Sequence, residues 1–206
     1  ENYESAELRG VFRELKNELE KEQIPLILFR GMEIFASRDM IRRLNGNELL
    51  SLNQSVYCLG EFNFSENELE MGEIFEEMLE SGRIPVIAHP ERYECVQENV
   101  NLLFEWMRMG CLSQMNKGSI FGKFGKRAAK TADLMLDHNL VSCVASDAHS
   151  PYARTPYMGD IQEYLSDRFN MEHMNRLLRG NPLRILENKK VSTQDILPVV
   201  RKKRWF

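Results

Sequence analysis

The hydrophobic residues of the chain form short runs that alternate with stretches of helical spacing. Four runs of four to six apolar residues have the length of buried strands. Between them, apolar side chains recur every three or four positions, which is typical of amphipathic helices. Strands are predicted at 24–29, 56–59, 84–88 and 141–145, with room for a further strand at 111–115. This alternation predicts an α/β protein with a parallel sheet, because crossover helices join parallel strands.

The predicted helices connect these strands and end at recognisable residues. Ser37 and the pattern Ser65-Glu66-Asn67-Glu68 are candidate N-terminal caps, and Gly82 and Gly110 are candidate stops. Met71, Met78, Met107 and Met109 lie at helical positions, where methionine usually packs in the core. Helices are expected at 3–22, 37–44, 65–81, 98–109, 123–138, 161–169 and 171–179, followed by a C-terminal segment at 183–188.

Acidic and histidine residues stand where the predicted strands end. Glu33, Glu61 and His89 follow one another at intervals of 28 residues, and Asp147 and His149 come 58 and 60 residues after His89. An interval of this size is the length of one strand plus one crossover helix. Because the carboxyl ends of parallel strands meet at one edge, these five side chains are expected to converge there.

The expected cluster has the composition of a metal site. Three carboxylates and two imidazoles without a thiolate suit Mn²⁺, Fe or Zn²⁺ better than Ca²⁺. Three carboxylates would place too much negative charge on a single ion. Two or more ions bridged by a carboxylate such as Glu33 would share this negative charge and lower the pKa of a bridging water. Arg92 and Arg154 are candidates for binding a phosphate, which a guanidinium group matches at two points. The alternative is that these side chains form buried salt bridges.

Composition narrows the class of protein further. The 206 residues are 43% hydrophobic and predict a single domain over 1–206. No apolar run reaches the roughly 18 residues needed to span a membrane, so a cytoplasmic protein without membrane insertion is expected. The net charge of −4 argues against a nucleic-acid surface, and the basic segment 201–204 is interpreted as a solvated end.

The cysteines predict core packing and exclude one enzyme class. Cys58, Cys95, Cys111 and Cys143 are scattered and are expected to be reduced, mostly buried residues. A thiol-dependent tyrosine phosphatase needs Cys-x-x-x-x-x-Arg. The residues six positions after these cysteines are Phe64, Asn101, Lys117 and His149, so this mechanism is excluded.

The chain opens on a predicted crossover helix, which is unusual for a parallel sheet because such a helix needs a preceding strand to cover. One or two βα units are therefore inferred to be missing from the N-terminal side. A (β/α) barrel also usually needs about 250 residues, more than are present here.

Four motifs together resemble the bacterial capsule and exopolysaccharide tyrosine phosphatases of the polymerase-and-histidinol-phosphatase (PHP) superfamily. The resemblance covers nearly the whole chain. The motifs are Gly31-Met32-Glu33-Ile34, Gly60-Glu61-Phe62, Ala88-His89-Pro90-Glu91-Arg92-Tyr93 and Ser146-Asp147-Ala148-His149, followed by Arg154 and Pro156.

The resemblance implies a distorted (β/α)7 TIM-like barrel with two or three metal ions, usually Mn²⁺, and Fe or Zn²⁺ as alternatives. It implies hydrolysis of phosphotyrosine by a metal-activated hydroxide, on the tyrosine kinase that regulates polysaccharide export. Glu33 would bridge metal ions, Glu61 and His89 would complete one site, and Asp147 and His149 would serve the others. Arg92 and Arg154 would hold the phosphoryl group.

One part of the family pattern has no counterpart in this sequence. The family has a His-x-His pair on its first strand, an Asp soon after it and another His after the second strand. His138 and His173 are predicted on helices and do not replace them. Either the sequence starts late, or the protein is a remnant that acts as a binding or regulatory module. A phosphatase of small phosphomonoesters such as histidinol phosphate is a further alternative. The sequence leaves the formation of a homo-oligomer open.

Overall fold

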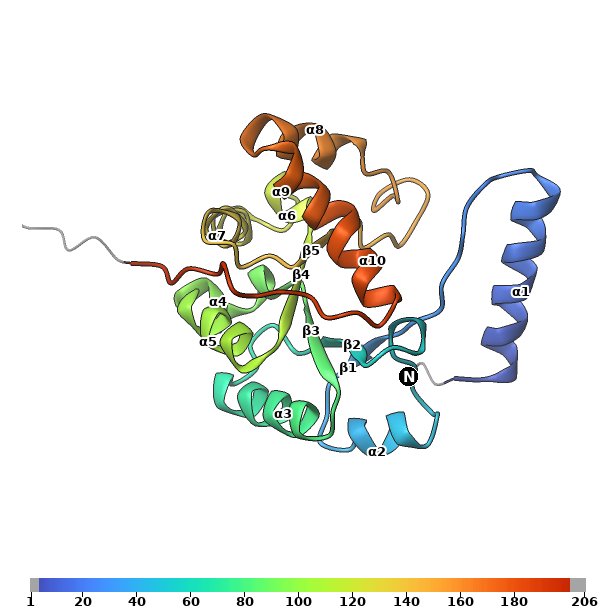
Figure 1. Cartoon of the computed structure of the whole chain (residues 1–206), viewed down its shortest axis with the longest axis horizontal. Coiled ribbons are helices and arrows are strands. Elements are labelled where there is room, and N and C mark those ends of the chain that lie inside the picture. The colour runs from blue at the N-terminus through green and yellow to red at the C-terminus, as the bar shows by residue number, and fades with distance from the viewer. Residues whose placement is uncertain (1–3, 201–206) are drawn as a thin grey trace, which may run out of the picture.

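A parallel β-sheet organises the chain in the computed structural model, which describes residues 4–200 (Figure 1). Within this range the sheet has five strands in the order β1-β2-β3-β4-β5, and each strand is parallel to its neighbours. Sequence order and spatial order therefore coincide, as expected for successive βα units. The strands are β1 (Glu33–Phe35), β2 (Tyr57–Glu61), β3 (Ile84–Ala88), β4 (Leu112–Asn116) and β5 (Cys143–Ala145).

Helices connect the strands and continue beyond the last one. Short 3-10 turns, η1 (Leu52–Gln54) and η2 (Pro90–Arg92), precede β2 and follow β3, and η3 (Arg176–Gly180) is a π-helical turn. The helices are α1 (Ala6–Lys21), α2 (Met40–Asn45), α3 (Glu68–Glu80), α4 (Glu94–Glu98), α5 (Asn101–Met109), α6 (Lys117–Ile120), α7 (Lys126–Asp137), α8 (Gly159–Arg168), α9 (Met171–Asn175) and α10 (Asn181–Leu186).

The two faces of the sheet are buried by different parts of the chain. On one face, Ile87, Met115 and Val144 belong to the large core that includes apolar side chains of α3, α5 and α7. Alternate strand residues such as Val86 and Leu112 point to the other face and pack with Ile185 of α10. This double burial explains why strands β2, β3 and β5 appear in the sequence as short, mostly apolar runs.

The α/β class and the parallel sheet are confirmed, but within residues 4–200 the sheet is open. The ladder runs from β1 to β5, and the pairings of these two strands are with β2 and β4. The closed barrel, the absence of earlier βα units and the single domain over 1–206 stay predictions. No helix in the described range is both long and apolar enough to cross a membrane.

The prediction of a strand at 24–29 is wrong. This segment is irregular, and Ile24, Leu26 and Ile27 are 50 to 77% exposed. The strand lies further on, where Glu33 and Phe35 pair with Leu59 and Glu61 of β2. A strand requires hydrogen bonds to a neighbouring strand. Between residues 24 and 35, only residues 33–35 pair with β2.

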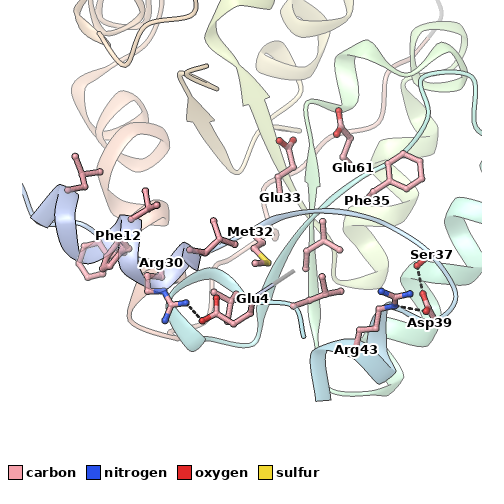
Figure 2. A pocket seen from close by; sticks show the side chains of 18 residues that line it. Glu4, Phe12, Arg30, Met32, Glu33, Phe35, Ser37, Asp39, Arg43 and Glu61 are labelled. Atoms are coloured by element: carbon pink, nitrogen blue, oxygen red, sulfur yellow. Dashed lines mark hydrogen bonds and ion pairs between the residues drawn. The ribbon is translucent and has the colours of Figure 1, made fainter. Parts of the chain in front are cut away.

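Helix α1 forms as predicted but does not act as a crossover helix. Its apolar residues Leu8, Val11 and Leu15 are 41 to 56% exposed, and the helix contains no buried residue. In Figure 1 it stands apart from the helices that flank the sheet. Its apolar side chains instead line a cavity of about 1020 Å³ that extends to β1, with Glu33 and Glu61 in its lining (Figure 2). Tyr3, the predicted first residue of this helix, lies outside the described residues, as does the basic segment 201–204.

The predicted helix caps are shifted by two residues. Asp39 is the N-cap of α2, and Ser37 donates a hydrogen bond to its carboxylate. Asn67 caps α3, because its side-chain oxygen accepts a hydrogen bond from the backbone N–H of Leu69 at 2.8 Å. A capping side chain must reach the second or third helical N–H group, and Ser65 lies too far upstream of Glu68 to do so.

The predicted core residues are mostly confirmed. Met71, Met78 and Met107 are buried, whereas Met109 is 40% exposed at the end of α5. All four cysteines are free thiols; Cys95 is half-buried and the others are buried. Burial raises the pKa of the Cys58 thiol to about 11 and that of Cys143 to about 12.

Candidate metal centre

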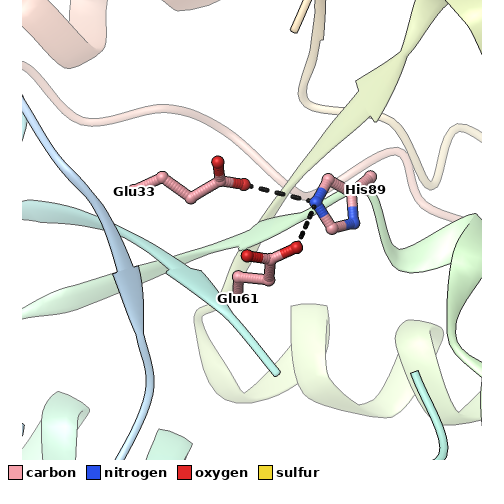
Figure 3. Close-up of side chains that lie close together, drawn as sticks. All are labelled: Glu33, Glu61 and His89. Carbon is pink, nitrogen blue, oxygen red and sulfur yellow. Dashed lines mark ion pairs between the residues drawn. The ribbon is translucent and has the colours of Figure 1, made fainter. Parts of the chain in front are cut away.

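Glu33, Glu61 and His89 meet at one edge of the sheet (Figure 3). The Nε2 atom of His89 lies 3.2 Å from Oε1 of Glu33 and 3.2 Å from Oε1 of Glu61. The three potential ligand atoms all lie within 4.8 Å of one another. Glu61 ends β2 and His89 follows β3, as predicted, but Glu33 begins β1 and does not follow it.

The backbone at His89 directs its ring toward the two carboxylates. His89 has φ of 34° and ψ of 55°, a left-handed conformation that is uncommon outside glycine. Its N–H donates to the Gln114 carbonyl of β4 at 2.7 Å, and Pro90 fixes the turn that follows. The rings of Phe64 and Tyr93 lie 5.9 and 6.0 Å from the imidazole. These contacts hold the histidine in one orientation, and its side chain is only 2% exposed.

The carboxylate of Glu33 has the protonation state that a metal ligand requires. A hydrogen bond with His89 lowers the pKa of Glu33 against the opposing effect of burial, and the charges of His89, His149 and Arg154 add to this shift. Glu33 is therefore ionised, as a metal ligand must be. The buried Nδ1 atom of His89 has no hydrogen-bond partner among the described residues. Two carboxylates and one imidazole at this spacing match the oxygen and nitrogen ligands of a divalent transition metal.

Asp147 and His149 form a second group after β5. Nδ1 of His149 lies 3.4 Å from Oδ1 of Asp147, whose other oxygen accepts hydrogen bonds from Arg154 and from Nδ2 of Asn116. This group does not join the first within 4.8 Å. The structure thus brings together three of the five predicted ligands and places the other two beside Arg154, which acts electrostatically on Glu33.

The two predicted phosphate-binding arginines lie near each other. Arg92 is half-buried between the rings of Phe64 and Phe124, with its Cζ atom 4.2 and 4.4 Å from their centroids. Cζ of Arg154 lies 5.6 Å from the centroid of Phe124. Burial and the positive charge of Arg92 lower the pKa of Arg154, so the two guanidinium groups are within electrostatic reach.

The family model described as capsular polysaccharide synthesis, CpsB/CapC, matches residues 1–187. The chain belongs to the CpsB/CapC family. Among curated relatives, CapC of Staphylococcus aureus is 35% identical over 94% of this chain and 75% of that protein. The tyrosine-protein phosphatase YwqE of Bacillus subtilis is 34% identical over 97% of this chain and 78% of its own.

A solved structure supports the same assignment. It comes from work on YwqE of Bacillus subtilis and CpsB of Streptococcus pneumoniae, which are described as metal-dependent tyrosine phosphatases. The TM-score is 0.84 at 34% identity, and the match covers 92% of this chain and 76% of that one. The resemblance to capsule phosphatases inferred from the four sequence motifs is therefore confirmed at the level of the family.

A buried polar network in this CpsB/CapC family member was missed by sequence analysis. Glu91 is fully buried, and its Oε1 accepts hydrogen bonds from the Asn116 N–H at 2.9 Å and from the Ser119 hydroxyl at 2.6 Å. Burial raises the pKa of Glu91. Asn116 in turn donates to Asp147. The sequence position of Asn116 could have indicated it, since Asn116 lies at the end of the fourth predicted strand in the same way as Glu61 lies at the end of the second.

Lys117 is a second residue that the sequence did not single out. Its Nζ donates to both carboxylate oxygens of Asp160 at 2.9 Å and to the Tyr157 carbonyl. Lys117 therefore holds the end of the segment 147–157, whose beginning Asn116 holds through Asp147. Two consecutive residues, the last of β4 and the first of α6, thus fix both ends of the segment 147–157, which carries His149 and Arg154.

The remaining histidines lie outside these clusters, as predicted. His138 follows the last turn of α7, where its Nδ1 lies 2.9 Å from the Leu134 carbonyl. His173 belongs to α9 and stacks on Phe169 with ring centroids 4.6 Å apart. Neither histidine contributes to the candidate metal centre.

Proposed function

We propose that the chain is a metal-dependent protein-tyrosine phosphatase whose substrate is a phosphotyrosine-bearing bacterial kinase that regulates capsular or exopolysaccharide synthesis. The observation that carries this proposal is the convergence of Glu33, Glu61 and His89 on one point at the sheet edge. Membership in the CpsB/CapC family, whose relatives include YwqE and CpsB, supports the choice of phosphotyrosine as the substrate.

The residues present fit a resident metal. Glu33, Glu61 and His89 would hold one ion, and Asp147 and His149 would contribute to further ions. We propose Mn²⁺, with Fe or Zn²⁺ as alternatives, because the donor set is mixed oxygen and nitrogen without thiolate. When bound, the metal would supply positive charge that activates water and neutralises phosphoryl oxygens.

The arginines and the surrounding side chains prepare the site for a phosphoryl group. Within residues 4–200, Arg92 forms no ion pair with a carboxylate, so its donors are available to an anion. Arg154 lies beside it and would share the phosphoryl oxygens. The Phe64 ring lies against both Arg92 and His89 and would exclude water from the space between them.

We expect direct hydrolysis without a phosphorylated enzyme. The buried thiols of Cys58, Cys111 and Cys143 have raised pKa values and are protonated at neutral pH, which makes them poor nucleophiles. Burial likewise raises the pKa of Tyr93, whose hydroxyl accepts a hydrogen bond from the Phe62 N–H. This hydroxyl is therefore also protonated at neutral pH and is a poor nucleophile.

We also propose that the sheet is one arc of a distorted (β/α)7 barrel within a single domain. Sequential order of parallel strands, each followed by a helix, is the arrangement expected of such a barrel. This proposal is independent of the chemistry and would be tested by a crystal structure of the protein.

The function is tested by measuring phosphate release from a phosphotyrosine peptide after chelation and re-addition of Mn²⁺, Fe²⁺ or Zn²⁺. We expect metal-dependent hydrolysis that falls about 100-fold or more in His89→Ala and Glu61→Gln, together with loss of bound metal. Glu66→Gln, a substitution outside the cluster, is the matched control and should retain activity.

Several results would contradict the proposal. Hydrolysis without metal, or a trapped covalent phosphoenzyme, would refute the mechanism. Faster turnover of small phosphomonoesters such as histidinol phosphate would assign a different substrate class. Metal binding without hydrolysis of any phosphomonoester would indicate a binding module.

A further inference from the structure

Phe124 is the side chain that Arg92 and Arg154 have in common. Its ring centroid lies 4.4 Å from Cζ of Arg92 and 5.6 Å from Cζ of Arg154. Phe124 lies between α6 and α7, outside all four motifs that carry the family resemblance. It therefore connects a residue that follows β3 with a residue that follows β5.

A shared aromatic ring addresses an electrostatic problem at this site. Two guanidinium groups that bind one phosphoryl group must lie close together before the anion arrives, although their charges repel. The negative face of an aromatic ring attracts cations, and each contact contributes about 0.5 to 2 kcal/mol, depending on solvent exposure. Arg154 also pairs with Asp147, whereas no carboxylate among the described residues pairs with Arg92. One ring in contact with both arginines therefore offsets part of their repulsion and leaves the donors of Arg92 free for phosphate.

Gly118 keeps the Phe124 ring in this place. A Cβ atom at Gly118 would lie 2.9 Å from Cε2 of Phe124, closer than real Cβ contacts allow. The backbone at Gly118 lies in the buried helix α6 and has no positive φ, so the glycine is not needed for its conformation. The ring of Phe124 fills the space that a side chain at position 118 would occupy. Gly118 directly follows Asn116 and Lys117, which hold the two ends of the segment 147–157.

We propose that Phe124 is a positioning residue that sets the separation of Arg92 and Arg154, so that the two guanidinium groups form one receptor for a phosphoryl group. The proposal rests on the phosphatase function proposed above for the substrate, but its physical content is the binding of a phosphate dianion. Gly118 belongs to the same arrangement, because the absence of a side chain there leaves space for the Phe124 ring.

The experiment combines phosphate binding with kinetics. Titration calorimetry with inorganic phosphate, on the metal-free and the Mn²⁺-loaded protein, is compared with kcat and KM for a phosphotyrosine peptide. In Phe124→Leu, which keeps an apolar side chain but removes the ring, we expect the phosphate Kd and KM to rise about 5- to 10-fold. The value of kcat and the bound metal should change less than about twofold, since the ring touches no predicted metal ligand.

Two further variants separate positioning from simple packing. Phe124→Tyr keeps the aromatic face and should restore the parent Kd and KM. Gly118→Ala touches neither arginine but displaces the ring, and should reproduce the effect of Phe124→Leu. The matched controls are Phe121→Leu, a neighbouring ring that contacts Tyr164, and Gly10→Ala, whose Cβ would meet nothing within 4 Å. Both controls should behave like the parent.

The outcomes distinguish this inference from the proposed function. Phosphate binding that depends on Phe124 in a protein without hydrolysis would refute the phosphatase and support the receptor. Hydrolysis that is unchanged in Phe124→Leu would refute the receptor alone. The inference would also be overturned if the parent bound no phosphate, or if phosphate affinity fell equally in Phe124→Tyr and Phe124→Leu. Loss of bound metal in both variants would overturn it as well.

Discussion

The contact between Lys117 and Asp160 provides a direct test of how the Arg154 segment is held. Replacing Lys117 by Met removes the ammonium group and keeps an apolar stem that can fill the same space. The variant loses the hydrogen bonds to Asp160 and to the Tyr157 carbonyl. It leaves Asn116 and its hydrogen bond to Asp147 in place, so only the far end of the segment is released.

The expected cost follows from the exposure of the two partners. Breaking a fully buried ion pair costs about 3 to 5 kcal/mol, whereas an exposed pair contributes about 0 to 1 kcal/mol. The Lys117 side chain is 6% exposed and that of Asp160 is 36% exposed, so water can solvate the aspartate once the lysine is gone. We therefore expect Lys117→Met to lower the free energy of unfolding by about 2 kcal/mol, which for a chain of this size corresponds to about 4 to 8 °C in Tm.

The pH dependence gives an independent check on the sign. Burial has the largest single effect and raises the pKa of Asp160, but the hydrogen bonds from Lys117 and from the Ile161 N–H, together with the charges of Lys117 and Lys123, outweigh it, and the pKa lies below the ordinary value of 3.8. A carboxylate with a lowered pKa in the folded state stabilises the fold above pH 4, and this contribution is lost as the pH falls through the folded-state pKa. The difference between parent and Lys117→Met should therefore be largest at neutral pH and should shrink at lower pH.

Urea unfolding of the parent, Lys117→Met, Asp160→Asn and the double variant measures the interaction directly. The two single changes should be non-additive by about 1 kcal/mol or more. Lys130→Met, which removes an exposed lysine of α7, should change stability by less than about 0.5 kcal/mol. Additive effects of the two single changes would show that the contact between Lys117 and Asp160 does not stabilise the segment 147–157. A decrease in the free energy of unfolding that is no larger in Lys117→Met than in Lys130→Met would show the same.

Two further predictions concern the rest of the fold. Gly110 has φ of +126° and lies against Leu79, so Gly110→Ala should lower the free energy of unfolding by about 1 to 2 kcal/mol, measured in urea, whereas Gly10→Ala within α1 should raise it slightly. Half-buried Cys95 should react first with iodoacetamide at pH 8, as measured by mass spectrometry, because the reagent can reach it whereas Cys58, Cys111 and Cys143 are buried; faster labelling of Cys143 would contradict the packing of β5.

The later strands could be predicted because their apolar runs are buried on both faces. The runs at 56–59, 84–88 and 141–145 correspond to β2, β3 and β5 within one or two residues, and the strand for which room was left at 111–115 corresponds to β4. The run at 24–29 has the same composition but remains irregular and exposed. Hydrophobicity alone does not show whether a segment has a neighbouring strand, and this is the information that the sequence lacked.

The candidate site was predictable only in part for a related reason. Glu61 and His89 follow strands, and the rule that strand ends gather ligands applies to both. Glu33 reaches the same point from the beginning of β1, because the register of β1 on β2 places it opposite Leu59. Phe124 and Lys117 lie after β4 within or beside a short helix, where neither hydrophobic period nor charge pattern distinguishes them from surface residues.

The left-handed backbone at His89 and Asp147 connects the stability of the sheet with the chemistry of its edge. Both residues follow buried strands, β3 and β5, and have φ of 34° and 50°. For a residue with a side chain this conformation costs roughly 1 to 2 kcal/mol, which glycine would avoid. Glycine carries no ligand atom, however, and the turn directs the side chain back over the sheet: His89 toward Glu33 and Glu61, and Asp147 toward Asn116 and Arg154. Burial of the preceding apolar residues offsets this cost, so the same core that forms the sheet also holds two side chains in orientations that the backbone alone disfavours.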